Sequence, residues 1–360
     1  MPRFLRFALP AALAALVLSG AGCFSLGPSP SSSTATGTNG IFQTADAGAT
    51  WSASTAVPTA TGVGSLAGAD ITALARDPQD DQTLYAGSKQ NGLFYSTDGG
   101  VSWKRPRLDA LRDGAVASVA VDPSSTCTVY AAKGPRIFKT TDCLRSFAAD
   151  AFVETRANVS VTDVRVDWYD PKTVWVGESD GGVQKSTDAG KTWRRVLSAF
   201  APVSAVLVSQ QDSRIVLAAT QGNGFYRTTD GGADWTQIRD QLKNLRGADT
   251  VFALAQDAKG SVIVASTQYG LVRSLDQGAN WEGVPLLTAP GQVAIRALAV
   301  GPSSGNVIAY ATSGTFYRST DGGRQWATHA LPSGHAPSVL AADPAQAMEY
   351  FLGFMTPPPS

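Results

Sequence analysis

The chain has 360 residues, of which 43% are apolar and 16% are charged, so it can form a sizeable core and is too apolar for a disordered chain. Lys plus Arg (29) balance Asp plus Glu (29), and this lack of a basic excess argues against a nucleic-acid partner. The 36 glycines and 20 prolines predict frequent turns and few helices.

Residues 1–22 are predicted to be an export signal of the lipoprotein type. Two arginines precede an apolar run, residues 7–18, which is too short to span a bilayer. Small residues then lead into Cys23. This segment resembles a bacterial lipobox, in which the cysteine is acylated, although Gly20 stands where the pattern usually has Leu. Ordinary cleavage near Ala21, with Cys23 an incidental thiol, is the alternative.

An eight-residue motif, Ser/Thr-x-Asp-x-Gly-x-x-Trp, recurs at a nearly constant spacing along the rest of the chain. Its aspartates are Asp46, Asp98, Asp142, Asp188, Asp230, Asp276 and Asp321, which lie 42 to 52 residues apart. Six copies end in tryptophan, namely Trp51, Trp103, Trp193, Trp235, Trp281 and Trp326. In the third copy, TTDCLRSF, the Gly and the Trp are replaced.

A tight turn between two strands explains this motif. The carboxylate can accept hydrogen bonds from nearby backbone N–H groups, Gly can adopt a positive φ, and the Trp ring can pack beneath the turn. The seven aspartates are therefore predicted to be structural and not catalytic.

Each repeat contains four segments of strand character. In the second repeat these are residues 71–76, 83–88, 92–97 and 102–105. Four strands in about 45 residues are typical of a β-propeller blade. The sequence predicts an all-β, seven-bladed propeller with four-stranded blades over residues 41–355.

The two ends of the propeller each supply half a blade. The chain enters at Ile41 with a third and a fourth strand, and it leaves with a first and a second strand, residues 338–342 and 349–355. A blade shared between the termini would close the ring and remove its open edges. Residues 23–40, rich in Ser, Thr, Gly and Pro, are predicted to be the lipidated cysteine and a flexible tether, and residues 356–360 a tail.

The octamers resemble the Asp-box, or bacterial neuraminidase repeat, of sialidases, sortilin-type receptors, xyloglucanases and photosystem II assembly-factor propellers. This resemblance implies that the boxes lie on one face, here called the box face, and that functional sites lie on the other. That other face, here called the mouth face, consists of the fourth-to-first-strand connections, the second-to-third-strand hairpins and the adjoining ends of the first strands. The layout is similar to that of the photosystem II assembly factors, but the strand patterns look closer to sortilin and glycosidase-like repeats, so no photosynthetic role is inferred.

Cys127 and Cys143 are predicted to form a disulfide, because exported cysteines usually pair. A hairpin turn at Gly134-Pro135 would pair residues whose numbers sum to 269 or 270, as those of the two cysteines do. Two free thiols are the alternative. No metal and no cofactor are predicted, and the two histidines, His329 and His335, are interpreted as solvated residues of one polar loop.

Two arginines are candidates for a ligand-binding mouth. Aligning the first strands places Arg165 and Arg296 at equivalent positions, three blades apart. Nearby charged residues could join them in binding an anion or a sugar; these are Glu154, Arg156, Asp163 and Asp167. Ion pairs between blades, such as Arg165 with Asp167, are the alternative. The Arg-Ile-Pro motif that the sialidase resemblance requires is absent, and a xyloglucan hydrolase would need a second propeller, so glycosidase activity is the less favoured hypothesis.

The mouth-face connections carry more cations than acids. Their cations are Lys104, Arg105, Arg107, Arg112, Arg156, Arg194, Arg195, Arg239, Lys243 and Arg246, against five acids. Such a surface suits docking to an acidic protein or glycan, and ordinary solvated loop charge is the alternative. The sequence thus favours a monomeric, lipid-anchored propeller of the bacterial cell envelope, on the periplasmic side or the cell surface. It would act as a non-catalytic scaffold, with a carbohydrate-binding or sialidase-like propeller as the alternative function.

Overall fold

A computed structural model describes residues 38–301, 305–343 and 346–357 of the chain. The predicted export signal, Cys23 and most of the predicted tether lie outside the described residues. No helix in the described residues has the length and hydropathy needed to cross a membrane.

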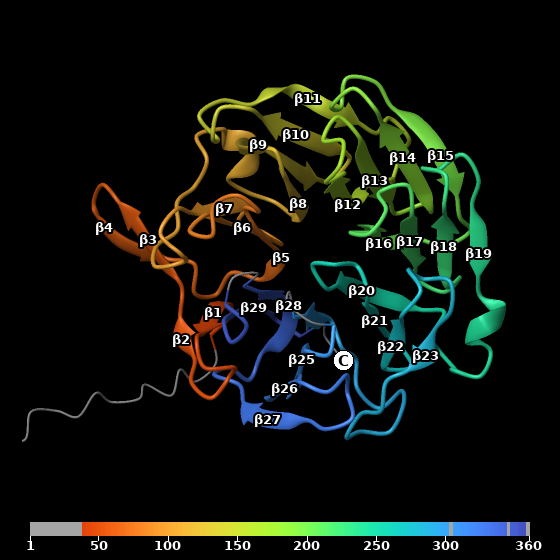
Figure 1. Ribbon diagram of the computed structural model, residues 1–360. Coiled ribbons are helices and arrows are strands. Elements are labelled where there is room, and N and C mark those ends of the chain that lie inside the picture. The colour runs from red at the N-terminus through yellow and green to blue at the C-terminus, as the bar shows by residue number, and fades with distance from the viewer. Residues whose placement is uncertain (1–37, 302–304, 344–345, 358–360) are drawn as a thin grey trace, which may run out of the picture. The chain divides into compact units, whose positions relative to one another are not determined.

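Seven sheets form the blades of a propeller, as the sequence predicts (Figure 1). Blade 1 joins β28 (Ala336–Ala342) and β29 (Tyr350–Met355) to β1 (Gly40–Thr44) and β2 (Ser52–Ala53). Blade 2 is β5 (Ile71–Arg76), β6 (Leu84–Ser88) and β7 (Leu93–Ser96). Blade 3 is β8 (Val116–Asp122), β9 (Ser125–Lys133), β10 (Arg136–Thr140) and β11 (Ala148–Val153). Blade 4 is β12 (Val161–Val166), β13 (Val174–Glu178), β14 (Gly182–Ser186) and β15 (Arg194–Ser198).

The remaining three blades follow the same order. Blade 5 is β16 (Val203–Val208), β17 (Val216–Thr220), β18 (Phe225–Thr228) and β19 (Thr236–Ile238). Blade 6 is β20 (Val251–Gln256), β21 (Ile263–Thr267), β22 (Leu271–Ser274) and β23 (Glu282–Gly283). Blade 7 is β24 (Ala297–Val300), β25 (Ile308–Thr312), β26 (Thr315–Ser319) and β27 (Ala327–Ala330). An additional hairpin, β3 (Ala56–Thr59) and β4 (Gly62–Ser65), lies between blades 1 and 2 in the chain.

Blade 1 combines strands from both ends of the described chain. β1 pairs antiparallel with β29 from Gly40 opposite Phe354 to Thr44 opposite Tyr350. The innermost strand of this blade, β28, lies against β24 of blade 7 and against β5 of blade 2.

The hydrophobic core lies between the blades. Second strands such as β6, β13, β17, β21 and β25 are buried along their whole length, because both of their faces pack on neighbouring blades. The apolar residues form seven clusters, each shared by two adjacent blades.

The fourth strand of blade 2 is shorter than predicted. The sequence predicts a strand at residues 102–105, whereas the structure has only an isolated bridge between Tyr95 and Lys104. Residues 54–56, where the chain enters β3, occupy the neighbouring position, since Trp103 donates its backbone N–H to the carbonyl of Ala56 (2.8 Å) and its indole Nε1–H to the carbonyl of Ser54 (3.0 Å). Trp103 is fully buried as a result.

The Asp-box turns have one hydrogen-bond pattern in all seven copies. In the second box the carboxylate of Asp98 accepts bonds from the Ser96 hydroxyl (2.7 Å) and from the backbone N–H of Ser102 (2.9 Å). The equivalent bond to the residue four positions after the aspartate recurs at 2.8–3.0 Å in the other boxes. These bonds favour the ionised carboxylate; in the third box, for example, the bond from the Ser146 hydroxyl lowers the pKa of Asp142 to about 2.

The Cys127–Cys143 disulfide predicted from the sequence is present in the structure. It links the start of β9 to the third Asp-box turn, where the backbone N–H of Cys143 also donates to the carbonyl of Cys127 (3.3 Å). The histidine interpretation was partly wrong, because His329 lies in β27 opposite Phe316 and both histidines are half-buried.

Candidate functional site

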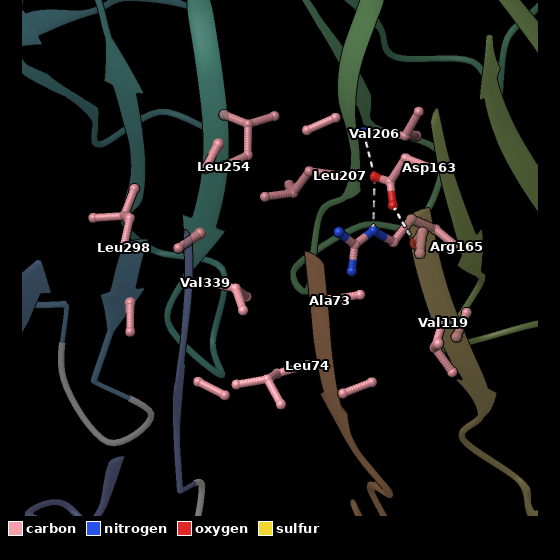
Figure 2. Close-up of a pocket in the computed structure, with 18 of the residues that line it drawn as sticks. Ala73, Leu74, Val119, Asp163, Arg165, Val206, Leu207, Leu254, Leu298 and Val339 are labelled. Carbon is pink, nitrogen blue, oxygen red and sulfur yellow. Dashed lines mark hydrogen bonds and ion pairs between the residues drawn. The ribbon is translucent and has the colours of Figure 1, made fainter. Parts of the chain in front are cut away.

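The first strands of the seven blades surround a central cavity of about 660 Å³. Figure 2 shows part of its wall, where aliphatic side chains such as Leu74, Leu254 and Leu298 lie across the cavity from one polar pair, Asp163 and Arg165. Asp163, Arg165 and Arg296 of the predicted mouth all line this cavity, whereas Glu154, Arg156 and Asp167 do not.

Asp163 connects three neighbouring blades. Its Oδ1 accepts a hydrogen bond from the Ser118 hydroxyl of blade 3 (2.7 Å), and its Oδ2 accepts one from the backbone N–H of Val206 of blade 5 (2.8 Å). The same Oδ2 accepts a bond from Nε of Arg165 at 3.1 Å. The carboxylate is 4% exposed and is fully occupied by these partners, so it holds the arginine in place.

Two predictions about this mouth were wrong. Arg165 pairs with Asp163 and not with Asp167, whose carboxylate accepts the backbone N–H of Tyr169 (2.8 Å) in the turn after β12. Burial raises the pKa of Asp167 above its usual value.

Arg165 and Arg296 are also not at equivalent positions. The residue that follows the first strand and donates its N–H to the carbonyl just before the second strand is Asp167 in blade 4 and Gly301 in blade 7. Arg165 therefore lies two residues before this position, and Arg296 lies five before it. At about 3.3 Å per residue, the two positions are roughly 10 Å apart along the strand direction. The alignment failed because it matched Asp170-Pro171 of blade 4 with Gly301-Pro302 of blade 7, whereas the residue equivalent to Gly301 is Asp167, three residues before Asp170.

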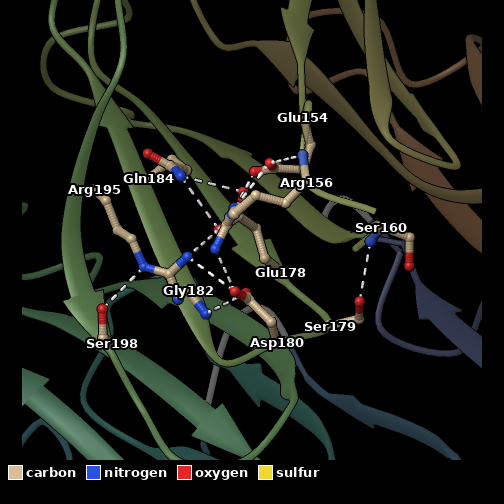
Figure 3. A network of polar contacts seen from close by, with 10 residues as sticks. All are labelled: Glu154, Arg156, Ser160, Glu178, Ser179, Asp180, Gly182, Gln184, Arg195 and Ser198. Atoms are coloured by element: carbon tan, nitrogen blue, oxygen red, sulfur yellow. Dashed lines mark hydrogen bonds and ion pairs between the residues drawn. The ribbon is translucent and has the colours of Figure 1, made fainter. Parts of the chain in front are cut away.

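Glu154 and Arg156 belong to a separate network between blades 3 and 4 (Figure 3). Arg156, in the connection after β11, donates to Glu154 Oε2 (2.6 Å) and to Glu178 Oε2 (2.9 Å), and it also pairs with Asp180. Arg195 of β15 approaches Asp180 (3.0 Å) and Glu178 (3.4 Å) from the other side. This network fixes the connection from blade 3 onto the β13–β14 hairpin.

Glu178 is the fully buried member of this network. Burial raises the pKa of Glu178 to about 7, while the hydrogen bond from Arg156 lowers the pKa of Glu154 to about 2. Sequence reasoning missed Glu178, Asp180 and Gln184, whose amide donates to the Glu178 carboxylate (3.2 Å). The scarcity of glutamate in the sequence could have indicated this network, because two of the only four glutamates in the chain belong to it.

The predicted basic face is less uniform than the sequence suggests. Lys104 and Arg194 lie toward the box face, since Lys104 donates to the Thr97 hydroxyl of the second box (2.9 Å) and Arg194 lies opposite Lys185, next to the fourth box. Five other cations form ion pairs; they are Arg112, Arg156, Arg195, Arg239 and Lys243. Arg105 stacks on the Phe94 ring (4.8 Å). In the described ranges, Arg107 and Arg246 are exposed and have no hydrogen-bond or ion-pair partner.

Two mouth-face connections share one local structure. Each contains a single 3-10 turn, η1 (Asp109–Leu111) after blade 2 and η2 (Asp240–Leu242) after blade 5. Each turn buries its leucine, and each aspartate pairs with the cation three residues later. The connection around η2 also encloses a cavity of about 410 Å³, which is lined in part by Arg239, Lys243 and Arg246. The buried leucines therefore hold two cationic connections in defined positions.

No cluster of three or more His, Cys, Asp or Glu side chains suited to a metal ion occurs among the described residues.

The fold and the repeats together define a seven-bladed β-propeller with BNR/Asp-box repeats. The family model for the BNR/Asp-box repeat matches residues 94–105, which include the second box. Comparison with curated protein sequences gives no match.

Solved structures of the same fold include both enzymes and a binding protein. The GH74 xyloglucanase from Xanthomonas campestris is 17% identical, with a TM-score of 0.63 over 80% of this chain and 51% of the enzyme, so this chain spans about half the enzyme's length. YCF48 bound to D1 peptide is 16% identical, with a TM-score of 0.60 over 79% of this chain and 93% of YCF48. YCF48 from Cyanidioschyzon merolae is 14% identical, with the same TM-score over 79% of this chain and 96% of that protein.

Proposed function

We propose that this protein is an exported, lipid-anchored propeller that binds a partner protein at its mouth face without catalysing a reaction. The observation that carries the proposal is the pair of matched connections around η1 and η2, which are anchored by Leu111 and Leu242. Anchored loops of this kind present their cations with little loss of conformational entropy on docking. The partner surface that fits Arg107 and Arg246 is acidic.

The burial and the hydrogen bonding of the carboxylates favour a binding function over glycoside hydrolysis. A glycosidase needs two carboxyl groups that face the sugar, about 5 Å apart in retaining enzymes and about 6.5–9.5 Å apart in inverting ones. The two carboxylates that line the central cavity, Asp77 and Asp163, are both buried, and both accept hydrogen bonds from fixed backbone groups. Glu154 and Glu178 are occupied by ion pairs with the Arg156 guanidinium.

The comparisons are compatible with this function. YCF48 is matched over nearly its whole length and has a solved structure with D1 peptide bound, so one propeller of this fold suffices for polypeptide recognition. Export is supported by the disulfide, since such bonds persist in oxidising compartments.

The docking face is tested by charge reversal on the two faces of the propeller. Arg107→Glu with Arg246→Glu should lower the recovery of envelope partners by tenfold or more in a pull-down from detergent-solubilised membranes, quantified by mass spectrometry. The matched control is Lys191→Glu with Arg324→Glu, which changes two exposed cations in Asp-box turns and should leave recovery unchanged. Equal recovery with both double variants would contradict docking at the mouth face. Release of sugar from xyloglucan or from a fluorogenic sialoside by the wild-type protein would favour the hydrolase alternative.

The anchor is tested by Cys23→Ser. This variant should move the protein from the membrane pellet to the soluble fraction, because an acyl chain on this cysteine would supply the membrane affinity. Fractionation followed by immunoblotting measures the distribution. Retention of the variant in the pellet after a high-salt wash would contradict lipid anchoring.

A further inference from the structure

The central cavity has the size and the uneven lining of a small-molecule site. Its volume of about 660 Å³ lies within the range of roughly 300–1,000 Å³ that is common for ligand pockets. At the level of Arg165 the other blades contribute mostly alanine; the equivalent residues are Ala75, Ala120, Leu207, Ala255, Ala299 and Ala341. These short side chains leave the space into which the arginine extends (Figure 2).

The exposed charge in the cavity is positive, although the chain as a whole is neutral. Five charged residues line the cavity within the described residues, namely Arg76, Asp77, Asp163, Arg165 and Arg296. Arg76 is buried and paired with Asp343 at 2.6 Å, and both aspartates are buried. Arg165 has 46% of its side chain exposed, and Arg296 is exposed as well. A ligand in the cavity therefore meets two guanidinium groups and no accessible carboxylate.

The guanidinium of Arg165 is fixed in an orientation that suits ligand binding. Its Nε is bound to Asp163, and that carboxylate is itself fixed by blades 3 and 5. Within the described chain, the two terminal nitrogens of the guanidinium have no hydrogen-bond partner and point into the cavity (Figure 2). A planar pair of donors of this kind matches the two oxygens of a carboxylate.

The rest of the lining selects for an apolar ligand body. Leu74, Leu254, Leu298 and Val339 form aliphatic walls around the space beside Arg165 (Figure 2). Nearer the mouth face, the guanidinium of Arg296 lies over the Phe252 ring at 4.9 Å, so its edge is open to an incoming anion. An ion without an apolar body, such as phosphate, would leave these walls in contact with water.

From this arrangement we propose that the central cavity binds a small organic carboxylate with an apolar body, with Arg165 bound to the carboxylate and the aliphatic walls covering the body. Arg296 attracts the anion at the mouth face. The entrance of this site lies on the mouth face, but neither Arg107 nor Arg246 of the docking connections lines the cavity, and its occupant is a small molecule.

Titration calorimetry on the full-length chain with octanoate as the probe tests the proposal. Octanoate should bind saturably at one site, whereas 1-octanol and inorganic phosphate should bind at least tenfold more weakly. Arg165→Met removes the charge at similar length and should weaken octanoate binding by tenfold or more. Arg324→Met is the matched control on the box face, and Arg107→Glu with Arg246→Glu tests independence from docking; both should leave octanoate binding unchanged.

A second variant keeps the test valid if Arg165→Met is poorly folded. Ala341→Leu fills the cavity at the level of Arg165 and leaves the Asp163–Arg165 pair intact, so it should also weaken octanoate binding, while its melting temperature reports on folding. Absence of saturable octanoate binding, equal binding of phosphate, or unchanged affinity in both cavity variants would each overturn the proposal.

Discussion

Six of the seven Asp-box turns have glycine two residues after the aspartate, and the third turn has Leu144 there. Both central residues of every box adopt a positive φ, which is +83° at Gly100 and +65° at Leu144. Glycine adopts this conformation without strain, whereas a leucine does so at a cost of about 1–2 kcal/mol. The third turn is also the one that the Cys127–Cys143 disulfide joins to the neighbouring strand.

The difference shows that the box glycine has two separate roles. One role is the positive φ, and the other is close approach to the preceding blade. A Cβ atom on Gly100 would lie 2.7 Å from Cε1 of Phe351 in blade 1, whereas on Gly190 the nearest atom would be 3.5 Å away, an ordinary contact. In the third turn Leu144 packs within the cluster that contains Tyr85 of the preceding blade. That turn therefore retains the φ of the motif but fills the space that glycine leaves elsewhere.

Among the changes that test this difference, removing the disulfide should cause the largest loss of unfolding free energy. Cys127→Ala with Cys143→Ala opens a covalent loop across 16 residues of sequence, for which the chain-entropy estimate is about 3 kcal/mol of unfolding free energy. Urea denaturation followed by tryptophan fluorescence measures the change. Reduction of the wild-type protein should lower stability by the same amount. A loss well below 1 kcal/mol would show that the third turn holds its conformation without the bond.

Two glycine substitutions, with smaller expected losses of unfolding free energy, should separate the two roles of glycine. Gly100→Ala combines backbone strain with displacement of Phe351, so we expect a loss of roughly 2–3 kcal/mol. Gly190→Ala brings the strain alone and should cost about 1 kcal/mol. Equal losses in the same urea experiment would contradict the role in close approach.

Local patterns predicted the blades well because strands and turns depend on neighbouring residues. The first strand of blade 2 was predicted at residues 71–76 and is observed as Ile71–Arg76. The disulfide followed from hairpin register in the same way, since Arg136 does lie opposite Lys133 across the Gly134-Pro135 turn.

Contacts between blades were predicted poorly, because they depend on register across residues that are far apart in the chain. In blade 4 the Asp-Pro pair begins at Asp170, three residues after the position that Gly301 occupies in blade 7, and this was enough to misplace Arg165 relative to Arg296. The partners of Asp163 come from three blades, and the Glu178 network joins two, so no single repeat contains either arrangement. The shortened fourth strand of blade 2 likewise depends on residues 54–56, where the chain enters β3.

The pairing of β1 with β29 also sets the order in which the molecule can be completed. β1 ends at Thr44 and β29 begins at Tyr350, so on the ribosome the first strand of the propeller is made roughly 300 residues before its partner. Until β29 emerges, β1 has one unpaired edge and blade 1 has no second strand. Blade 1 therefore stays open until β29 has been synthesised.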